Sequence, residues 1–308
     1  MPKDQVIAAA IDLGSNSFRL LIGSPTEEGL SCLLKKRSVV RLGRGLTKTG
    51  TFSTENIEQA LLALAAFRLE IDRFGATLIR CCGTEAFRRA ANREALTVPA
   101  KEILDTPVTI LDGKEEAELS CLGVISALGD RLSFPCLIAD VGGGSTELIL
   151  LRSAESRPVV ISLPVGVVSF AEQDQTSQTD DLNKLAAGLK KLTCGLNPPP
   201  SPILVGTGGT AGSLATLDQK LPHHDIGKIH GHFLTRQRLG AIYTSLASLN
   251  ARQRQKQPGL EAGREDILMP GLEIYQEILA TIGGEGMMVS EAGLLEGILL
   301  SITRGYRS

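Results

Sequence analysis

The stretch Ile11-Asp12-Leu13-Gly14-Ser15-Asn16-Ser17-Phe18-Arg19-Leu20 decides the fold, because the chain contains it twice. Its second copy is Ala139-Asp140-Val141-Gly142-Gly143-Gly144-Ser145-Thr146-Glu147-Leu148, 128 residues further along. Aspartate, glycine, serine and leucine keep their spacing in both copies. Each copy follows one apolar run and leads into another, which predicts a β-hairpin with a tight turn. Backbone N–H groups in such a glycine-rich turn can hold an anion.

A single Asp-x-Gly hairpin is an ordinary structural turn, whereas two copies in register favour a duplicated domain with both turns facing one cleft. The surrounding segments alternate between strand and helix patterns. Residues 54–74 repeat apolar side chains at helical spacing until Gly75, and residues 77–82 follow as a strand. Helices are also expected near 265–282 and 291–303. The sequence therefore predicts an α/β protein with ligands at the ends of its strands.

Some segments carry no such alternation. Residues 251–266 are rich in Arg, Gln and Gly, and we expect a mobile surface segment there. Asn197-Pro198-Pro199-Pro200 is expected to be a loop. His223-His224-Asp225 lies in a polar stretch and is expected at the surface, and His230 is expected to be structural.

Composition limits the functional classes. With 308 residues, 43% of them hydrophobic, the chain can bury about 75% of its unfolded surface and form two domains. Its 32 basic and 34 acidic residues argue against general nucleic-acid binding, although a local positive site stays open. The six cysteines form no CxxC pair and are expected to be reduced. Without an 18-residue apolar stretch or a signal peptide, a cytoplasmic protein with no membrane partner is expected.

A third glycine-rich turn, Val205-Gly206-Thr207-Gly208-Gly209-Thr210-Ala211-Gly212, follows a predicted strand and opens a helix. Its N–H groups and the helix dipole favour a phosphate. The turn also matches the dinucleotide fingerprint G-x-G-x-x-A, but the acid that should follow about 20 residues later is only loosely supplied by Asp225. The chain has no G-x-x-x-x-G-K-[ST] motif, which excludes a P-loop NTPase.

Acidic residues gather beside these turns. Gly113-Lys114-Glu115-Glu116-Ala117-Glu118 places three acids at the start of a helix, where they stabilise the helix or supply a general base for an attacking water. Asp12, Asp140 and Glu147 add negative charge near the proposed phosphate loops. A carboxylate ~4 Å from a phosphate charge costs about 4 kcal/mol at an effective dielectric near 20, so a divalent cation, Mg²⁺ held through waters, is predicted.

Two arginines follow a Gly-Thr-Glu segment that lies between the two copies of the repeat. Arg88 and Arg89 follow Gly83-Thr84-Glu85, where they can contact phosphate or form a solvated helix face. The sequence shows no Ser or Cys nucleophile beside a base, so direct attack by water is favoured over a covalent intermediate.

Together, these motifs resemble the exopolyphosphatase/guanosine pentaphosphate phosphohydrolase (Ppx/GppA) family, within the actin-like superfamily of sugar kinases and heat-shock chaperones. The resemblance runs nearly end to end, and the ordered set of motifs carries it. Beyond the segments already quoted, the set comprises Ala86-Phe87-Arg88 after Gly83-Thr84-Glu85, Ser162-Leu163-Pro164-Val165-Gly166, and Val289-Ser290-Glu291-Ala292-Gly293-Leu294.

The resemblance implies a two-lobed actin-like ATPase (ribonuclease H-like) fold of duplicated βα domains with a cleft between them. Residues 1–125 would form the first lobe, joined by a C-terminal helix at about 291–308, and residues 126–290 would form the second. It also implies residue roles. Glu116 resembles the catalytic base, Arg88 a phosphate contact and catalytic residue, and Asp140 and Glu147 metal-linked or water-orienting catalytic acids. The residues that match the phosphate-cradling loops are Asp12, Ser15, Asn16, Gly143, Gly144, Ser145, Gly208, Gly209 and Thr210.

The activity implied is hydrolysis of the terminal phosphate of inorganic polyphosphate, or of guanosine pentaphosphate in the stringent response, by metal-assisted water attack. Two alternatives stay open: a small-molecule kinase on the same fold, and a non-catalytic regulator that binds an alarmone or a nucleotide. Longer family members carry a further C-terminal helical domain that this sequence lacks. We therefore expect a preference for short polyphosphate chains, or a homodimer that completes the channel.

Overall fold

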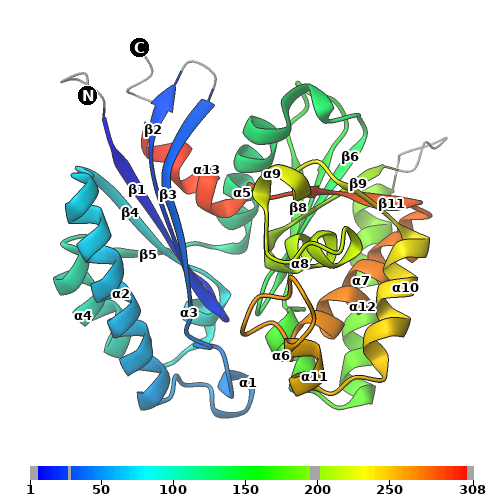
Figure 1. Cartoon of the computed structure of the whole chain (residues 1–308), viewed down its shortest axis with the longest axis horizontal. Helices are drawn as coiled ribbons and strands as arrows, with labels where there is room; N and C mark the ends of the chain where they lie inside the picture. The colour runs from blue at the N-terminus through cyan, green and yellow to red at the C-terminus, as the bar shows by residue number, and fades with distance from the viewer. Residues whose placement is uncertain (1–5, 27–28, 195–201, 304–308) are drawn as a thin grey trace. The chain divides into compact units, whose positions relative to one another are not determined.

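The computed structural model describes residues 6–26, 29–194 and 202–303. The chain divides into two compact units. Unit 1 consists of Met1–Ala127 with Leu294–Ser308, and unit 2 consists of Leu128–Gly293. Each unit has one β-sheet with helices packed against it (Figure 1). The loop expected at 197–200 lies outside the described residues.

The sheet of unit 1 has the strand order β3-β2-β1-β4-β5. The first three strands are antiparallel neighbours, and β1, β4 and β5 run parallel. Parallel neighbours require crossover connections, which the helices between them provide. The strands are β1 (Ala8–Leu13), β2 (Ser17–Thr26), β3 (Gly29–Val39), β4 (Leu78–Gly83) and β5 (Val108–Ile110).

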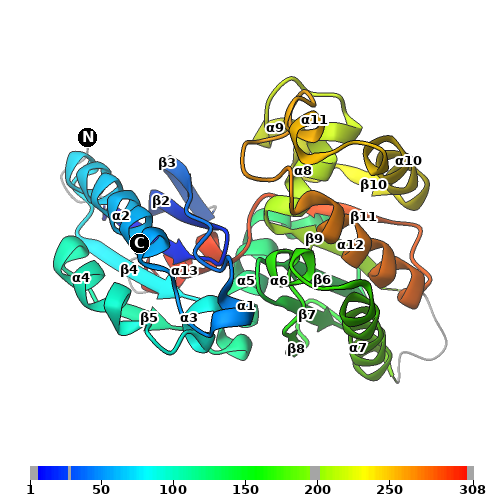
Figure 2. The same ribbon diagram turned by 90° about the horizontal axis from the view of Figure 1, so that it is seen from below.

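Helices cover both faces of this sheet. Helices α2 and α4 pack over one face, which carries Ile11, Phe18 and Leu20, while α13 packs over the opposite face at Ala10 and Leu21 (Figures 1 and 2). The strand alternation of buried side chains on both faces is what a sheet covered on both sides requires. The helices of unit 1 are α1 (Leu46–Thr49), α2 (Thr54–Phe74), α3 (Glu85–Arg89), α4 (Glu94–Leu104), α5 (Gly113–Leu128), which reaches the first residue of unit 2, and α13 (Leu294–Thr303).

Helix α2 confirms the predicted helix over residues 54–74. Ser53 caps its N-terminus, because the Ser53 hydroxyl accepts from the Asn56 amide at 3.2 Å. Gly75 ends the helix at φ 66°, a left-handed conformation that glycine adopts without a steric cost.

The sheet of unit 2 repeats this plan and adds one edge strand. Its order is β10-β11-β9-β6-β7-β8, with β6, β9 and β11 parallel and β6, β7 and β8 antiparallel. Read from β8, the order matches β3-β2-β1-β4-β5 strand by strand. The strands are β6 (Cys136–Val141), β7 (Thr146–Leu151), β8 (Val159–Leu163), β9 (Ile203–Thr207), β10 (Phe233–Thr235) and β11 (Gly286–Ser290).

One hydrophobic core joins the helices of unit 2 to one face of its sheet. Side chains of β6 such as Leu137 and Ala139 pack in it with Leu214 of α8 and Leu272 and Ile278 of α12. Apolar burial of this kind is the dominant favourable term in folding. The helices are α6 (Val167–Ala171), α7 (Gln175–Thr193), α8 (Gly208–Asp218), α9 (Ile226–Ile229), α10 (Arg236–Ala247), α11 (Ala251–Gln255) and α12 (Leu268–Ile282).

The duplication extends to individual hydrogen bonds. In the first hairpin, the Gly14 amide donates to the Ser17 carbonyl at 3.3 Å, and in the second the Gly142 amide donates to the Ser145 carbonyl at 2.9 Å. Both predicted β-hairpins are therefore confirmed, with their turns in the same register.

The expectation of a mobile surface segment over 251–266 is wrong in its second half. Leu260 and Gly263 are buried, and Leu260 and Ile267 belong to the core of unit 2. Two apolar anchors, one within the polar run and one just after it, hold the run against the protein. Among residues 6–26, 29–194 and 202–303, no helix combines the length and the apolar content needed to cross a membrane.

Candidate functional site

The second hairpin places two carboxylates side by side. Asp140 on β6 and Glu147 on β7 are direct cross-strand partners, so their side chains project from the same face of the sheet. Both are buried, and the Ser162 hydroxyl of β8 donates to Glu147 Oε1 at 2.7 Å. Like charges placed directly opposite each other on a sheet are destabilising, and a bound cation relieves that repulsion.

The N-terminus of α8 begins next to Asp140. Thr207, the last residue of β9, is the register partner of Asp140, and Gly208 follows it at φ 83°. A Cβ at Gly208 would lie 3.0 Å from Asp140 Oδ1, so glycine is required both by the backbone and by this close approach. The Thr207 hydroxyl donates to the Ala292 carbonyl at 2.9 Å and makes no cap for α8. The amides of the first turn of α8 are thus left for a ligand or water.

The turn of the second hairpin is held from its carbonyl side. The Gly142 and Gly143 carbonyls accept from the Val167 and Val168 amides at 3.0 and 2.8 Å. Gly166 lies so close that a Cβ there would be 2.4 Å from Gly144 backbone atoms. In the described part of the chain, no hydrogen bond to protein is made by the Gly143 or Gly144 amide. The turn therefore has the N–H groups that an anion cradle needs.

The structure brings the predicted site residues of unit 2 to one edge of its sheet, because β6 and β9 are parallel and end together. Those residues are Asp140, Gly143, Gly144, Ser145, Glu147, Gly208, Gly209 and Thr210.

In unit 1, Asp12 faces an arginine instead of an acid. Its cross-strand partner is Arg19, whose Nε and Nη2 lie 2.7 and 2.6 Å from Asp12 Oδ2. Asp12 is 2% exposed, and its second oxygen, Oδ1, is buried without a hydrogen-bond partner. A buried carboxylate oxygen in that state is suited to accept from a water or a ligand.

The other predicted residues of the first hairpin also lie at its turn. The Ser15 hydroxyl forms a hydrogen bond with Glu85, a carboxyl whose pKa is raised by burial. The Asn16 carbonyl accepts from the Arg41 amide at 2.8 Å, and its side chain donates to the Ser17 hydroxyl. Gly43 packs on Ser15 as Gly166 packs on the second turn.

Glu116 and Arg88 form an ion pair. Arg88 Nη1 lies 2.7 Å from Glu116 Oε2 and also donates to the Leu111 carbonyl at 2.8 Å. Glu116 is buried, and its position one turn into α5 is set by Asp112, whose side chain accepts from the Lys114 and Glu115 amides. A carboxylate held in this way has the form that a general base requires.

The three acids of this helix start therefore have different surroundings. Glu115 pairs with Arg80 at 2.7 Å, while its amide donates to the Asp112 side chain. Glu118 is exposed, 3.9 Å from Lys114. Of the three acids, only Glu116 combines burial with an arginine partner, and the family resemblance, not the local pattern of acids, singles it out.

Sequence reasoning missed two residues of the unit 2 site. The Arg264 guanidinium occupies the space beside Gly209, where a Cβ would be 1.6 Å from Nη2. Tyr275 is fully buried in α12 and donates to the Ala139 and Thr207 carbonyls at 3.3 and 3.0 Å, which ties β6 to β9. Neither residue belongs to a glycine-rich motif. The sequence held one signal for Arg264: it lies between the apolar residues Leu260 and Ile267, which anchor the otherwise polar segment.

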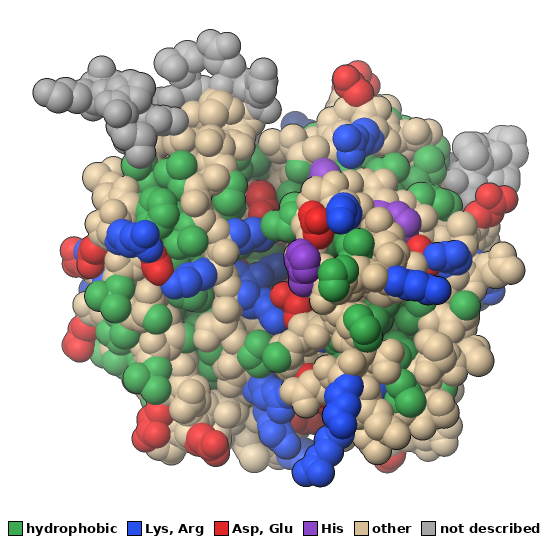
Figure 3. All heavy atoms as spheres, viewed as in Figure 1, with side chains coloured by type: hydrophobic (Ala, Val, Ile, Leu, Met, Phe, Trp, Pro, Cys, Tyr) green, Lys and Arg blue, Asp and Glu red, His purple; other side chains and the backbone are tan. Residues whose placement is uncertain are grey.

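Histidine placement corrects another expectation. His223 is exposed as predicted, but His224 is half-buried and lies 2.8 Å from Glu291. Histidine side chains come to the surface of unit 2 over α8 and α9 (Figure 3).

Two of the buried cysteines are poor nucleophiles. Burial raises the pKa of Cys82 to about 12 and that of Cys121 to about 11, so both thiols are protonated at neutral pH. All six cysteines are free; four are buried, and Cys32 and Cys194 are exposed.

The donor set fits a hard divalent cation with few protein ligands. Within the described residues, no group of three or more His, Cys, Asp or Glu side chains is arranged to hold a metal. Mg²⁺ is commonly bound by one or two carboxylates together with waters and substrate phosphates. Asp140 and Glu147 match that pattern, whereas a structural zinc site does not fit.

Comparison with known proteins assigns the chain to a family. The model of the "Ppx/GppA phosphatase family" matches residues 21–305. The chain belongs to the Ppx/GppA phosphatase family. Exopolyphosphatase 2 of Mycobacterium tuberculosis is 29% identical over 315 residues, covering 96% of this chain and 98% of the relative.

Solved structures of Ppx/GppA relatives share the fold. The Aquifex aeolicus family member superposes with a TM-score of 0.77 at 28% identity, covering 99% of this chain and 100% of the relative. An exopolyphosphatase from Cytophaga hutchinsonii gives a TM-score of 0.80 at 25% identity, covering 97% of this chain and 98% of the relative. The chain is an exopolyphosphatase-like phosphatase of this family, and the predicted α/β actin-like ATPase fold with duplicated domains is confirmed.

Proposed function

We propose that the chain is an exopolyphosphatase that hydrolyses the terminal phosphoanhydride of inorganic polyphosphate, with guanosine pentaphosphate as the alternative substrate with the same end group. The observation that carries the proposal is the Asp140–Glu147 pair next to the N-terminus of α8. Paired carboxylates beside uncapped helix amides suit a metal-bound phosphate chain better than a neutral ligand.

The proposed roles follow from the contacts of each side chain. The amides of Gly143, Gly144 and the first turn of α8 bind and orient phosphate oxygens. Ser162 holds the Glu147 carboxylate, and Asp140 lies against Gly208, so both acids are positioned before substrate arrives. A divalent cation held by Asp140 and Glu147, Mg²⁺ in our proposal, would supply charge neutralisation for the departing phosphate oxygen.

Glu116 is the proposed base. It accepts the proton of the attacking water, and its ion pair with Arg88 keeps the carboxylate in a fixed position. Asp12, Ser15 and Asn16 are proposed to contact the phosphate chain at the first hairpin turn. The buried, unpartnered Oδ1 of Asp12 supports this placement, because it can accept from a water that hydrates the substrate.

The decisive experiment compares Glu116→Gln with Glu118→Gln. Both acids stand on α5, but Glu118 is exposed and lies 3.9 Å from Lys114. Phosphate release should be measured over polyphosphates of defined length and, in parallel, from guanosine pentaphosphate. A loss of about 10²–10⁴-fold in kcat is expected for Glu116→Gln, the usual contribution of a general base, with Glu118→Gln unchanged.

The same assay separates the alternatives. Equal turnover of Glu116→Gln and the unmodified chain would overturn the assignment of the base. Transfer of labelled phosphate from ATP to a small acceptor, without release to water, would identify a kinase. Tight binding of guanosine pentaphosphate without any phosphate release would identify a regulator.

A further inference from the structure

His224 and Glu291 pack directly against helix α8. Glu291 Oε1 lies 2.4 Å and His224 Cε1 lies 2.9 Å from where a Cβ of Gly212 would be. Gly212 is one helical turn after Gly208, so this contact holds the segment of α8 next to its N-terminal amides. Glycine at this position lets two polar side chains reach the helix backbone.

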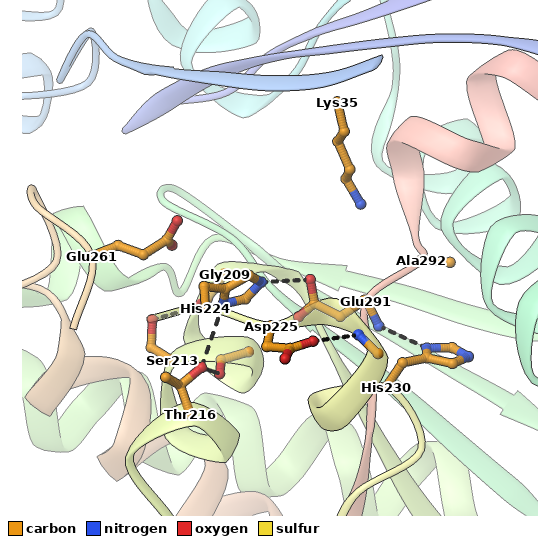
Figure 4. A network of polar contacts seen from close by, with 12 residues as sticks. Lys35, Gly209, Ser213, Thr216, His224, Asp225, His230, Glu261, Glu291 and Ala292 are labelled. Atoms are coloured by element: carbon orange, nitrogen blue, oxygen red, sulfur yellow. Dashed lines mark hydrogen bonds and ion pairs between the residues drawn. The ribbon is translucent and has the colours of Figure 1, made fainter. Parts of the chain in front are cut away.

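The hydrogen bonds of His224 favour its protonated form. The Thr216 hydroxyl donates to the Gly212 carbonyl at 2.8 Å, so its oxygen is the acceptor toward His224 Nδ1 at 3.4 Å. His224 Nε2 lies 2.8 Å from Glu291 Oε2, a carboxylate oxygen that can only accept when ionised (Figure 4). This arrangement suits donation from both ring nitrogens, as in the imidazolium form.

His230, on the other side of Glu291, has the opposite role. Its Nδ1 accepts from the Glu291 amide at 3.2 Å, so that nitrogen carries no proton (Figure 4). Glu291 therefore contacts the His224 ring through its carboxylate, and its backbone amide donates to the His230 ring. The two histidines cannot exchange roles without breaking one of these bonds.

The charged groups around His224 favour the imidazolium. The hydrogen bond to Glu291 raises the pKa of His224 above 6.5, and the Glu291 and Glu261 charges act in the same direction. Burial and the Arg264 guanidinium act against it, but the pKa is raised on balance. Asp225, the next residue, accepts from the Gly227 amide and begins α9.

We infer that His224 is a positioning residue for phosphate binding: as an imidazolium held between Glu291 and Thr216, it fixes α8 so that the amides of its first turn meet the substrate. This inference rests on the proposed function of the α8 N-terminus. His224 does not touch the substrate, and its effect passes through Gly212 and the helix backbone.

The positioning role of His224 predicts the direction in which KM and stability change with pH. Because the pKa of His224 is raised in the folded protein, the imidazolium is present below that pKa and is lost as pH rises through it. The KM for terminal phosphate release should therefore rise over this range, by about twofold to fivefold, the size of a helix-terminus interaction with an anion. The contribution of the His224 imidazolium to the free energy of unfolding should also be lost over this range. That contribution is fully present below 6.5, the ordinary pKa of histidine, and it disappears as the pH rises through the raised pKa of the folded protein.

The experiment uses the whole chain and three variants. His224→Gln keeps a donor for Glu291 but has no charge, so its KM should be raised at low pH and lack the pH-dependent rise. Glu291→Gln should move that rise to lower pH, because the main cause of the raised pKa is removed. His223→Gln, an exposed neighbour, should match the unmodified chain at every pH. An unmodified pH profile in His224→Gln, measured on folded protein, would overturn the inference.

A second measurement does not depend on turnover. The ring signals of His224 followed by NMR should titrate above 6.5, and should titrate lower in Glu291→Gln. Tripolyphosphate binding by calorimetry should weaken as His224 loses its proton. If both results hold but no substrate is hydrolysed, the proposed function fails while the positioning role stands. A His224 pKa at or below 6.5 contradicts the positioning role, whatever the activity.

Discussion

The two hairpins have the same strand register but differ in charge. Asp12 and Asp140 occupy the same position at the ends of β1 and β6, and each faces its cross-strand partner in the same register. That partner is Arg19 in the first hairpin and Glu147 in the second. Duplication therefore preserved the scaffold, whereas one side chain decides between an internal ion pair and a pair of carboxylates suited to a cation.

The difference teaches that a hairpin motif and its chemistry can be separated. Both units carry Asp-x-Gly before a short turn, in which the glycine amide donates to a serine carbonyl. The residue near the start of the returning strand differs between the two copies, being Arg19 in one and Glu147 in the other. In the first hairpin it partly neutralises a buried acid, and in the second it doubles the negative charge.

The largest expected effect comes from neutralising the second hairpin. Glu147→Gln keeps the size of the side chain and a bond to Ser162 but removes one charge. Phosphate release should fall by about 10²–10³-fold, the usual range for a lost electrostatic contact at a reacting centre. Steady-state kinetics at saturating Mg²⁺ provide the measurement, with the exposed Glu155→Gln as control. Retained turnover would show that the carboxylate pair has no catalytic role.

The next effect is on the stability of the first hairpin. Arg19→Gln leaves the Asp12 carboxylate buried with a weaker partner, and should lower the free energy of unfolding by about 2–3 kcal/mol, less than a fully buried pair because Arg19 is partly exposed. Urea unfolding measures this loss. Arg73→Gln, which removes an exposed ion pair with Glu70, should change stability little.

A double-mutant cycle makes the comparison sharper. If Asp12→Asn restores most of the stability lost in Arg19→Gln, the two residues are coupled as the structure shows. Additive losses would mean that Arg19 acts through its other contacts.

A smaller effect on stability and KM is expected from substituting the glycines at the ends of β4 and β9. Gly83 follows the register partner of Asp12, and Gly208 follows that of Asp140. Gly83→Ala places a Cβ 2.8 Å from the Phe87 ring and should cost about 1–2 kcal/mol by overpacking. Gly208→Ala should cost about 1 kcal/mol through its positive φ, but should also raise KM. Thermal or urea unfolding with parallel kinetics tests both; a raised KM in Gly83→Ala alone would reverse the comparison.

The smallest effect is stabilisation by the metal. If Asp140 and Glu147 bind Mg²⁺, saturating metal should raise Tm by about 2–4 °C over a chelator-treated sample, as mass action on the folded state predicts. The shift should be absent in Glu147→Gln and present in Arg19→Gln. An equal shift in all three proteins would place the metal elsewhere.

Sequence reasoning was strongest for features that depend on local spacing. The repeated Asp-x-Gly stretch predicted both hairpins, and the end of α2 at Gly75 followed from helical periodicity and glycine. It was weakest where distant segments meet. Arg264 lies beside Gly209 and His224 beside Glu291, and no periodicity links such pairs. The roles proposed for the site residues of both units stay predictions until the variants are measured.

By itself, the sequence determined the two hairpins, their glycine turns and the family, because spacing along the chain is enough to specify them. Only the tertiary structure decided which partner each carboxylate has: Arg19 for Asp12, Glu147 for Asp140, Arg88 for Glu116 and His224 for Glu291. The physical reason is that the electrostatics of a buried acid depends on groups within a few ångströms in space. Folding, and not the order of residues, brings most of those groups together.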